Sequence, residues 1–186
     1  MDKYQRFIGH VKMDVKIQIK TWFQWIRNKI LIMEGIIMTK YETMCDTYKH
    51  KQTVNKLINL VIKELTDRAV NHDNSKLGDF EVDIFTEYTP KLAICTYGSE
   101  EYKQFLKEMK PALDHHYENN RHHPEYHLNG IKDMDLVDLI EMMCDWKAAS
   151  LRHNDGDIYK SIEINQNRFG YSNELKQIFE NTVRKL

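Results

Sequence analysis

The sequence Asn71-His72-Asp73-Asn74-Ser75-Lys76 places a His-Asp pair at the point where a long amphipathic helical pattern ends. At the end of a helix, an imidazole and the carboxylate that follows it can both turn toward one cation. Imidazole nitrogen and carboxylate oxygen together suit Zn, Mn, Fe or Co, whereas Mg favours the carboxylate alone. An isolated His-Asp pair is more typical of a solvated helix end, so its meaning depends on the other histidines and acids of the chain.

Six further side chains extend the His-Asp pair into a candidate metal site. Asp145 is expected on a helix among apolar neighbours, which is an unusual position for a carboxylate without a partner. The other five are histidines, of which one precedes the pair and four follow it in two adjacent doublets. The predicted metal ligands are His50, His72, Asp73, His115, His116, His122, His123 and Asp145. The sequence leaves open which member of each histidine doublet binds, and whether the site holds one ion or two.

Composition places the chain among all-α proteins with a proper hydrophobic core. Its 186 residues are 41% hydrophobic and 30% charged, and it has only 7 Gly and 3 Pro. A net charge of -1 gives no global attraction to nucleic acid or to a membrane surface. Three cysteines without a C-x-x-C motif fit a reducing compartment. Because no apolar run approaches the roughly 18 residues that span a bilayer, we expect a cytoplasmic protein without a membrane span.

Two helical stripes are expected to be buried. Spacings of three and four residues predict one buried helix face, which aims His50 inward. Its members are His50, Val54, Leu57, Val61 and Leu65. A later helix, begun by an N-cap at Asp133 or Asp135, is expected to bury a second stripe. Its members are Val137, Ile140, Cys144 and Leu151, and the Met142-Met143 pair is expected in the core as well.

Local signals predict three further features. Ser99 before Glu100-Glu101 is a predicted helix N-cap. Residues 119–130 are expected to be largely loop, and Asn173 introduces a last helix.

Residues 1–37 differ in character from the rest of the chain. Seven Lys/Arg stand against three acids there, a net charge of +4, which leaves -5 on the remainder. Strict apolar-polar alternation over residues 11–20 predicts a half-buried strand, followed by a helical pattern that carries Trp22. This basic amphipathic extension is interpreted as a peripheral element, in preference to a membrane-surface segment. A native start at Met38 is an alternative, which N-terminal sequencing of the native protein would test.

The order of these residues resembles a known superfamily. His50, His72-Asp73 and Asp145 follow the H…HD…D order of the HD superfamily of metal-dependent phosphohydrolases. Residues 72–76 look like the H-D-x-G-K form common there, with Ser in place of Gly, although the interval from His50 to His72 is shorter than usual. His122-His123-Pro124-Glu125 is similar to the extra histidines that bind a second metal in binuclear members.

Residues 41–186 also resemble a family of small phage and bacterial proteins of unassigned function. The shared features are His50…Val54, Arg68…His72-Asp73-x-Ser75-Lys76, His122-His123-Pro124-Glu125 and Glu141-Met142-Met143-Cys144-Asp145-Trp146.

The superfamily resemblance implies an HD-domain-like helical bundle over residues 38–186, with the metal site in its core. It implies one or two divalent ions, with Mn, Co, Fe, Mg and Zn not distinguished. The implied activity is phosphohydrolysis of a small nucleotide: a nucleoside 5′-monophosphate, a cyclic nucleotide or a triphosphate. Lys76 is expected to meet a phosphate oxygen, and Glu81 or Glu125 to act as general acid. Candidates for holding a base or sugar are Tyr117, Asn119, Asn120, Arg121 and Trp146.

Two other classes of function stay open. One is a non-hydrolytic module that binds a metal or a nucleotide, and the other is di-iron oxidation chemistry. A nucleic-acid polymer is not expected as a partner, because residues 38–186 are acidic. A homodimer is an open alternative, and a phage-encoded protein would act in the host cytoplasm.

Overall fold

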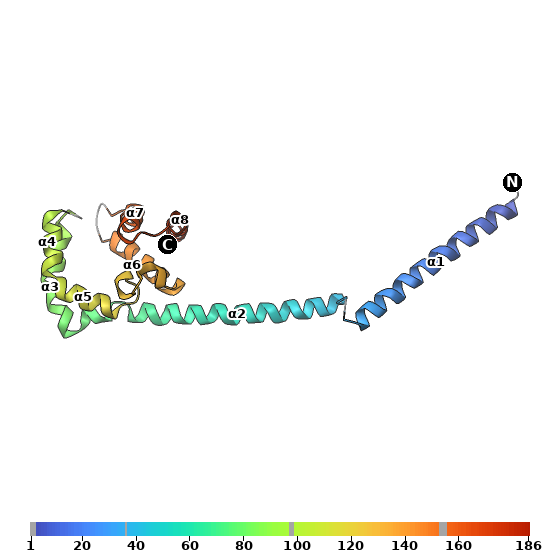
Figure 1. Cartoon of the computed structure of the whole chain (residues 1–186), viewed down its shortest axis with the longest axis horizontal. Coiled ribbons are helices and arrows are strands. Elements are labelled where there is room, and N and C mark those ends of the chain that lie inside the picture. The colour runs from blue at the N-terminus through green and yellow to red at the C-terminus, as the bar shows by residue number, and fades with distance from the viewer. Residues whose placement is uncertain (1–2, 36, 97–98, 153–155) are drawn as a thin grey trace. The chain divides into compact units, whose positions relative to one another are not determined.

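The computed structural model describes residues 3–35, 37–96, 99–152 and 156–186, with side chains from residue 15 onward. These residues form helices joined by turns and contain no strand, which confirms the all-α prediction (Figure 1). The chain divides into two units, residues 1–58 and residues 59–186, and the boundary falls inside one long helix. Each unit is described by itself. None of the described helices is long and apolar enough to cross a membrane.

The first unit contains α1 (Lys3–Met33) and the beginning of α2 (Lys40–Asn71). The strand prediction for residues 11–20 is therefore wrong, because these residues lie within α1. Their alternation does not prevent a helix, and the described part of the chain offers no strand to pair with them. A capping box begins α2: Thr39 Oγ1 accepts from the Glu42 backbone N–H, and Glu42 Oε2 accepts from the Thr39 backbone N–H.

The face of α2 that was predicted to be buried is exposed. Val54 is 37% exposed, Leu57 57% and Val61 46%, and His50 is exposed as well. Leu65, nearer the end of the helix, is only partly exposed. The periodicity correctly identifies a helix with one apolar face, but no described element packs along that face.

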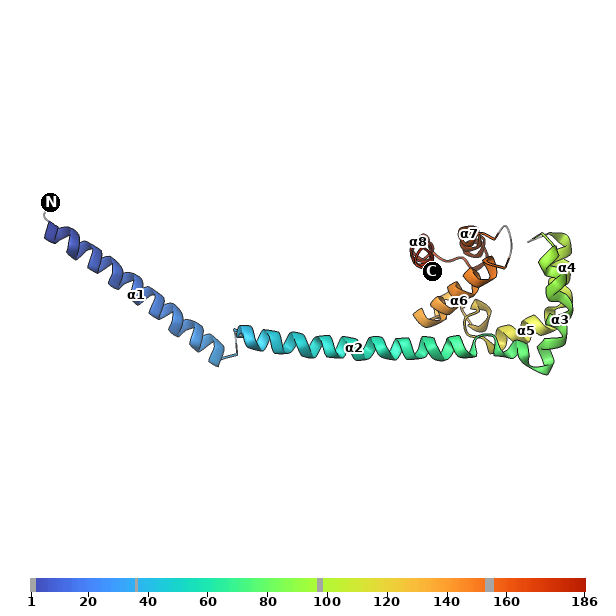
Figure 2. The same cartoon turned by 180° about the vertical axis from the view of Figure 1, so that it is seen from behind.

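The second unit contains the end of α2 and two groups of packed helices (Figures 1 and 2). The first group consists of α3 (Asp79–Ile94), α4 (Glu100–Glu108) and α5 (Lys110–Asn119). The second consists of α6 (Leu136–Ser150), α7 (Ile158–Phe169) and α8 (Asn173–Val183). Three short 3₁₀ helices connect these elements: η1 (Asn74–Leu77), η2 (Pro124–Tyr126) and η3 (Gly130–Asp133).

Several predicted helix starts are confirmed. Ser99 caps α4, its hydroxyl accepting from the Tyr102 backbone N–H at 3.1 Å. Asp135, rather than Asp133, caps α6 and forms a capping box with Asp138. The last helix begins at Asn173 as predicted, with Ser172 as its N-cap.

The hydrophobic core of the second unit lies among α6, α7 and α8. Its buried members are Met142, Met143, Ile158, Ile162, Tyr171, Phe179 and Val183. The prediction for Met142-Met143 is confirmed, whereas Ile140 and Leu151 of the neighbouring stripe are 37% and 73% exposed. Cys144 is also exposed, and Val137 is only partly buried. The predicted stripe and the methionines lie on adjacent faces of α6, and α7 and α8 pack on the face that carries the methionines.

Candidate metal centre

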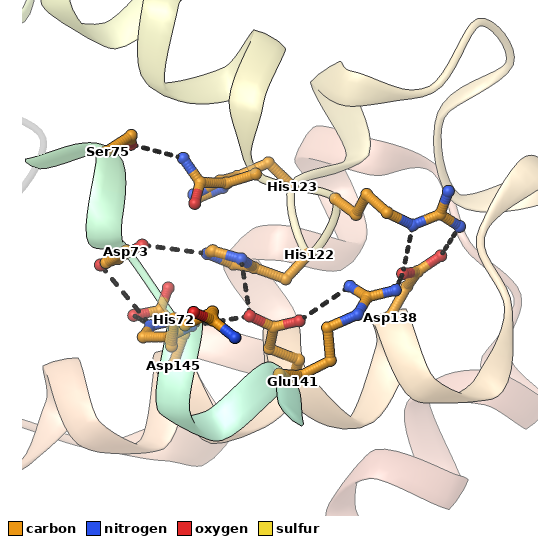
Figure 3. A network of polar contacts seen from close by, with 12 residues as sticks. His72, Asp73, Ser75, His122, His123, Asp138, Glu141 and Asp145 are labelled. Carbon is orange, nitrogen blue, oxygen red and sulfur yellow. Dashed lines mark hydrogen bonds and ion pairs between the residues drawn. The ribbon is translucent and has the colours of Figure 1, made fainter. Parts of the chain in front are cut away.

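The predicted His-Asp pair lies where α2 ends, between η1, the residues that follow α5, and α6 (Figure 3). Asp73 has φ 57°, and it is the one described non-glycine residue with a positive φ. This left-handed conformation ends the helical path after Asn71 and lets Asp73 point toward the residues that follow α5. Asp tolerates this region better than most residues, because its short side chain can bond locally.

Two imidazoles, from the end of α5 and the turn after it, approach one oxygen of Asp73, and a third lies beside them. Nε2 of His116 lies 3.3 Å from Asp73 Oδ1, and Nε2 of His122 lies 3.5 Å from it. Nε2 of His123 lies 2.9 Å from Nε2 of His116. One ligand atom from each of these four residues lies within 4.8 Å of the others. This set is called the imidazole group: Asp73, His116, His122 and His123.

Two atoms of the imidazole group lack the partner that burial requires. Asp73 Oδ1 and His122 Nε2 are buried and have no hydrogen-bond partner in the structure. An unsatisfied buried polar atom costs about 1–3 kcal/mol. A divalent cation held between them would meet both atoms, so the residues fit a metal ion at this position.

The other oxygen of Asp73 faces a second group. Oδ2 accepts from Lys76 Nζ at 2.6 Å and lies 3.5 Å from His72 Nε2. His72 Nε2 also lies 3.7 Å from Asp145 Oδ1. His72, Asp73 and Asp145, here the acidic group, can each supply a ligand atom to one ion. Its side chains are less buried than those of the imidazole group, with 20–29% of their surface exposed.

Two further carboxylates, Glu141 and Glu81, contact the Nδ1 atoms of these imidazoles. Glu141 Oε1 contacts Nδ1 of His72 at 2.9 Å and Nδ1 of His122 at 3.2 Å (Figure 3). Glu81, which is fully buried, contacts Nδ1 of His115 at 2.6 Å and Nδ1 of His116 at 3.1 Å. A neutral imidazole that donates its Nδ1 hydrogen to a carboxylate keeps the Nε2 lone pair for a cation. Both carboxylates therefore orient Nε2 atoms toward the candidate metal positions.

The electrostatics of the two groups differ in what they imply for cation binding. Hydrogen bonds with Asp145 and Glu141 raise the pKa of His72 to about 10, so this imidazole must release a proton before it can bind a metal. Burial raises the pKa of Asp73, but the nearby imidazole of His116, 3.3 Å from Oδ1, and the charge of Lys76 outweigh it and keep the carboxylate ionised. Burial, with His122 and His116 close by, lowers the pKa of His123 to about 3. An ionised Asp73 beside a neutral His123 is the protonation state that a bound metal requires.

Two arginines form hydrogen bonds with carboxylates next to the site. Arg68 Nη1 donates to Glu141 Oε2 at 3.1 Å, and its Nη2 donates to Asp138 Oδ1 at 3.1 Å. Arg121 donates to both oxygens of Asp138, at 3.2 and 3.0 Å. Asp138 is fully buried on α6, and these contacts connect α6 to the end of α2 and to the residues after α5.

A polar cavity lies beside the metal groups. It has a volume of about 190 Å³, and its walls include the outer carboxylate Glu141 and His122 of the imidazole group. The remaining lining residues are Arg68, Asn71, Asn119, Asn120 and Arg121. Amide and guanidinium groups next to a metal group are suited to binding the polar part of a ligand.

Asp138→Asn is expected to destabilise the second unit by about 2–3 kcal/mol. The change leaves two guanidinium groups without their buried counter-charge, and their partial exposure keeps the loss at the low end for broken buried ion pairs. Burial raises the pKa of Asp138, but Arg121 outweighs it and lowers the pKa below its ordinary value. The stabilisation is therefore complete above the unfolded-state pKa of about 4 and is lost as the pH falls through the lower folded-state value.

Urea unfolding at pH 7 and at pH 3 measures both effects. The difference between wild type and Asp138→Asn should be smaller at pH 3. Asp133→Asn, which removes an exposed carboxylate of η3, is the matched control. An unchanged unfolding midpoint for Asp138→Asn would contradict the role of the two arginine contacts.

The structure brings together most of the predicted ligands but not all of them. The imidazole and acidic groups account for His72, Asp73, His116, His122, His123 and Asp145. His115 contacts Glu81 and the ring of Phe80, and it belongs to neither group. His50 lies on the exposed surface of α2 in the first unit and is also outside both groups.

The predicted catalytic residues and Trp146 each contact other side chains of the second unit. Lys76 pairs with Asp73, and Glu81 contacts two histidines. Glu125 forms an ion pair with Arg168. Trp146 packs with the aromatic rings of the α6–α8 core.

The four polar residues predicted to hold a base or sugar lie near the metal groups. Asn119, Asn120 and Arg121 line the cavity, and the Tyr117 ring lies 4.9 Å from that of His123.

Four residues that build the site were missing from the predicted set: Ser75, Glu141, Arg68 and Asp138. Ser75 Oγ lies 3.0 Å from His116 Nδ1 and accepts from the Asn120 amide. Arg68, Ser75 and Glu141 stand in the sequence motifs quoted above, but their contacts join residues about 40 to 70 positions apart. The sequence signal available for Asp138 was its helical spacing of four from Met142, and for Glu141 its helical spacing of four from Asp145.

Comparison with known proteins gives one match. The model of a family of unknown function, DUF5662, matches residues 39–185. No curated protein and no solved structure matches the chain.

Proposed function

The chain belongs to the DUF5662 family, and we propose that it is a metal-dependent phosphohydrolase that acts on a small nucleotide. The observation that carries the proposal is the convergence of Nε2 atoms on Asp73, with two of the buried atoms, Asp73 Oδ1 and His122 Nε2, unpartnered. The arrangement of outer carboxylates behind the imidazoles supports a metal rather than a simple hydrogen-bonded network. The resemblance of His72-Asp73 and Asp145 to the HD superfamily motif supports the reaction class.

The two groups would hold two ions with Asp73 between them. Its Oδ1 faces the imidazole group and its Oδ2 faces the acidic group. A divalent cation bound there lowers the pKa of a coordinated water and neutralises phosphoryl oxygens. Lys76, whose ammonium is 2.6 Å from Asp73 Oδ2, offsets part of the negative charge that three carboxylates bring to the site.

The cavity gives the proposed substrate its chemical class. Arg68 and Arg121, whose charges are paired with Asp138 and Glu141, provide guanidinium groups, and three asparagines provide hydrogen-bond donors and acceptors next to His122. A phosphate ester with a sugar or base presents the matching groups. The cavity volume of about 190 Å³ suits part of a nucleotide rather than a polymer.

Hydrolysis of a panel of nucleoside monophosphates, triphosphates and cyclic nucleotides tests the proposal, with Mn, Co or Mg added to the metal-stripped protein. The products are separated by chromatography, because opening a cyclic phosphate releases no free phosphate. Turnover that requires an added metal and disappears in Asp73→Ala is the expected result, because Asp73 faces both ions. The bound metal is measured in the same samples.

Absence of turnover with every nucleotide of the panel would contradict the proposed activity. If the protein binds metal tightly but hydrolyses none of them, it would be a non-hydrolytic binding module. Iron retention with an absorbance change on reduction would indicate oxidation chemistry.

A further inference from the structure

The imidazole group and the acidic group differ in how far their own side chains satisfy one another. Among the described residues, the buried side-chain atoms without a hydrogen-bond partner are Asp73 Oδ1 and His122 Nε2. Both atoms belong to the imidazole group, where they lie 3.5 Å apart (Figure 3). A buried polar atom is stable only with a partner. These two atoms therefore need a partner that no described side chain supplies.

The side chains of the acidic group already have partners. Oδ2 of Asp73 accepts from Lys76 Nζ at 2.6 Å and lies 3.5 Å from His72 Nε2. His72 also lies 3.7 Å from Asp145 Oδ1, and its Nδ1 contacts Glu141 at 2.9 Å. A cation that enters this group must replace contacts that already stabilise the carboxylates. It should therefore bind more weakly than a cation in the imidazole group.

The donor atoms of the two groups favour different ions. The imidazole group offers three imidazole nitrogens and one carboxylate oxygen, a set of four ligands that suits zinc. The acidic group offers one nitrogen and two carboxylate oxygens. Carboxylates suit Mg and Mn, and Mg in particular keeps several of its water ligands. The first set can surround an ion with protein atoms, whereas the second leaves positions for water or a substrate.

The separations within the imidazole group fit a tetrahedral ion. Zinc bonded to four ligands at about 2.0–2.1 Å holds the ligand atoms about 3.3–3.4 Å apart. Nε2 of His116 lies 3.3 Å from Asp73 Oδ1, and Nε2 of His122 lies 3.5 Å from it. Nε2 of His123 lies 2.9 Å from that of His116. His116 and His122 are almost fully buried, whereas the side chains of the acidic group are 20–29% exposed.

The imidazole group joins segments that lie outside the hydrophobic core. That core lies among α6, α7 and α8. Asp73 precedes η1, His116 lies on α5, and His122 lies in the turn after α5. Glu81 of α3 contacts His116, and Glu141 of α6 contacts His122. An ion held by these imidazoles would connect the end of α2 to α5 and, through the two glutamates, to α3 and α6.

We propose that the two groups have different roles: the imidazole group retains a structural zinc ion, and the acidic group binds an exchangeable Mn or Mg ion that meets the substrate. The retained ion follows from the unpartnered atoms, the donor set and the burial, and it does not depend on hydrolysis. The role of the exchangeable ion rests on the proposed function. Asp73 links the two positions, since each group takes one of its oxygens.

Metal retention in the wild type tests the division of roles. Metal-stripped protein receives an equimolar amount of zinc and an excess of Mn, is desalted, and is then dialysed against increasing EDTA. Elemental analysis should find about one zinc per chain after desalting, whereas Mn should be lost there and rebind when it is added back. Removal of the zinc should lower the unfolding midpoint by about 10 °C, the shift expected from a ligand at 100 times its Kd.

Two variants separate the groups. His123→Ala removes a ligand of the imidazole group alone and should weaken zinc binding by more than about 100-fold, beyond the effect of an outer partner. Asp145→Asn removes a ligand of the acidic group alone, so it should keep the zinc and weaken Mn binding to a similar extent. Asp114→Asn removes an exposed carboxylate of α5 and is the control that should keep both ions.

Circular dichroism checks the fold of each variant. If His123→Ala does not fold, the wild-type retention series and Asp145→Asn still decide the division of roles, since neither needs that variant.

The outcomes separate this inference from the proposed function. Loss of zinc and Mn at the same EDTA concentration, or zinc retention that depends on Asp145 rather than His123, would overturn the division even if the protein hydrolyses nucleotides. Retained zinc without hydrolysis of any nucleotide would support the structural ion and refute the proposed function. A wild type that binds neither ion would overturn both.

Discussion

Asp73→Asn is expected to weaken Mn binding by more than about 100-fold and to reduce phosphate release to background. Loss of a direct ligand should exceed the 10–100-fold effect typical of outer partners. Asp73 is shared by the imidazole and acidic groups, so the single change removes a ligand from both. Asparagine keeps the size of the side chain and tolerates the left-handed backbone at φ 57°.

Isothermal titration of the metal-stripped protein with Mn measures the affinity, and circular dichroism checks the fold. Asp79→Asn, in the first turn of α3, removes an exposed carboxylate six residues away and is the matched control. Wild-type Mn affinity in Asp73→Asn would show that the unpartnered Oδ1 does not face a cation.

Glu141→Gln is expected to weaken metal binding by about 100-fold, at the upper end of the range for outer carboxylates. One carboxylate oxygen here contacts Nδ1 of both His72 and His122, which belong to different groups. Glutamine keeps the volume but removes the charge that makes the two imidazoles better ligands. Because the direct ligands remain, a high concentration of Mn should restore most of the phosphate release.

Glu64→Gln is the control for this experiment. Glu64 also pairs with Arg68, at 3.0 Å, but it contacts none of the candidate ligands and is half exposed. Activity measured against metal concentration separates the two variants. If Glu141→Gln lost activity that no metal concentration restores, Glu141 would have a role other than orienting the histidines.

The sequence was informative where chemistry and local structure coincide. The His-Asp pair lies at a helix end, Asp145 on a helix face and the doublet His122-His123 in a loop, all of which local patterns indicate, and the structure brings them together. N-caps such as Ser99 and Asp135 were predictable for the same reason, since a cap depends on the next three residues.

Long-range partners were not predictable in the same way. Which of two neighbouring stripes on α6 is buried depends on where α7 and α8 pack, so Ile140 was assigned to the core in error. Glu81 was expected to donate a proton, but its two histidine partners lie about 34 positions away, and their approach depends on the packing of α3 against α5. Alternation over residues 11–20 suggested a strand, because a period of two carries no information about whether a pairing strand exists.

The left-handed backbone at Asp73 implies a compromise between stability and activity. Non-glycine residues in this conformation cost of order 1 kcal/mol or more, and glycine would adopt it with no steric penalty. Folding alone would therefore favour glycine at the position where α2 ends. The chain instead keeps a carboxylate there, together with a buried oxygen that no protein group satisfies. Selection for stability and selection for activity would act in opposite directions on this residue. A substitution at residue 73 that stabilises the fold is therefore expected to remove metal binding.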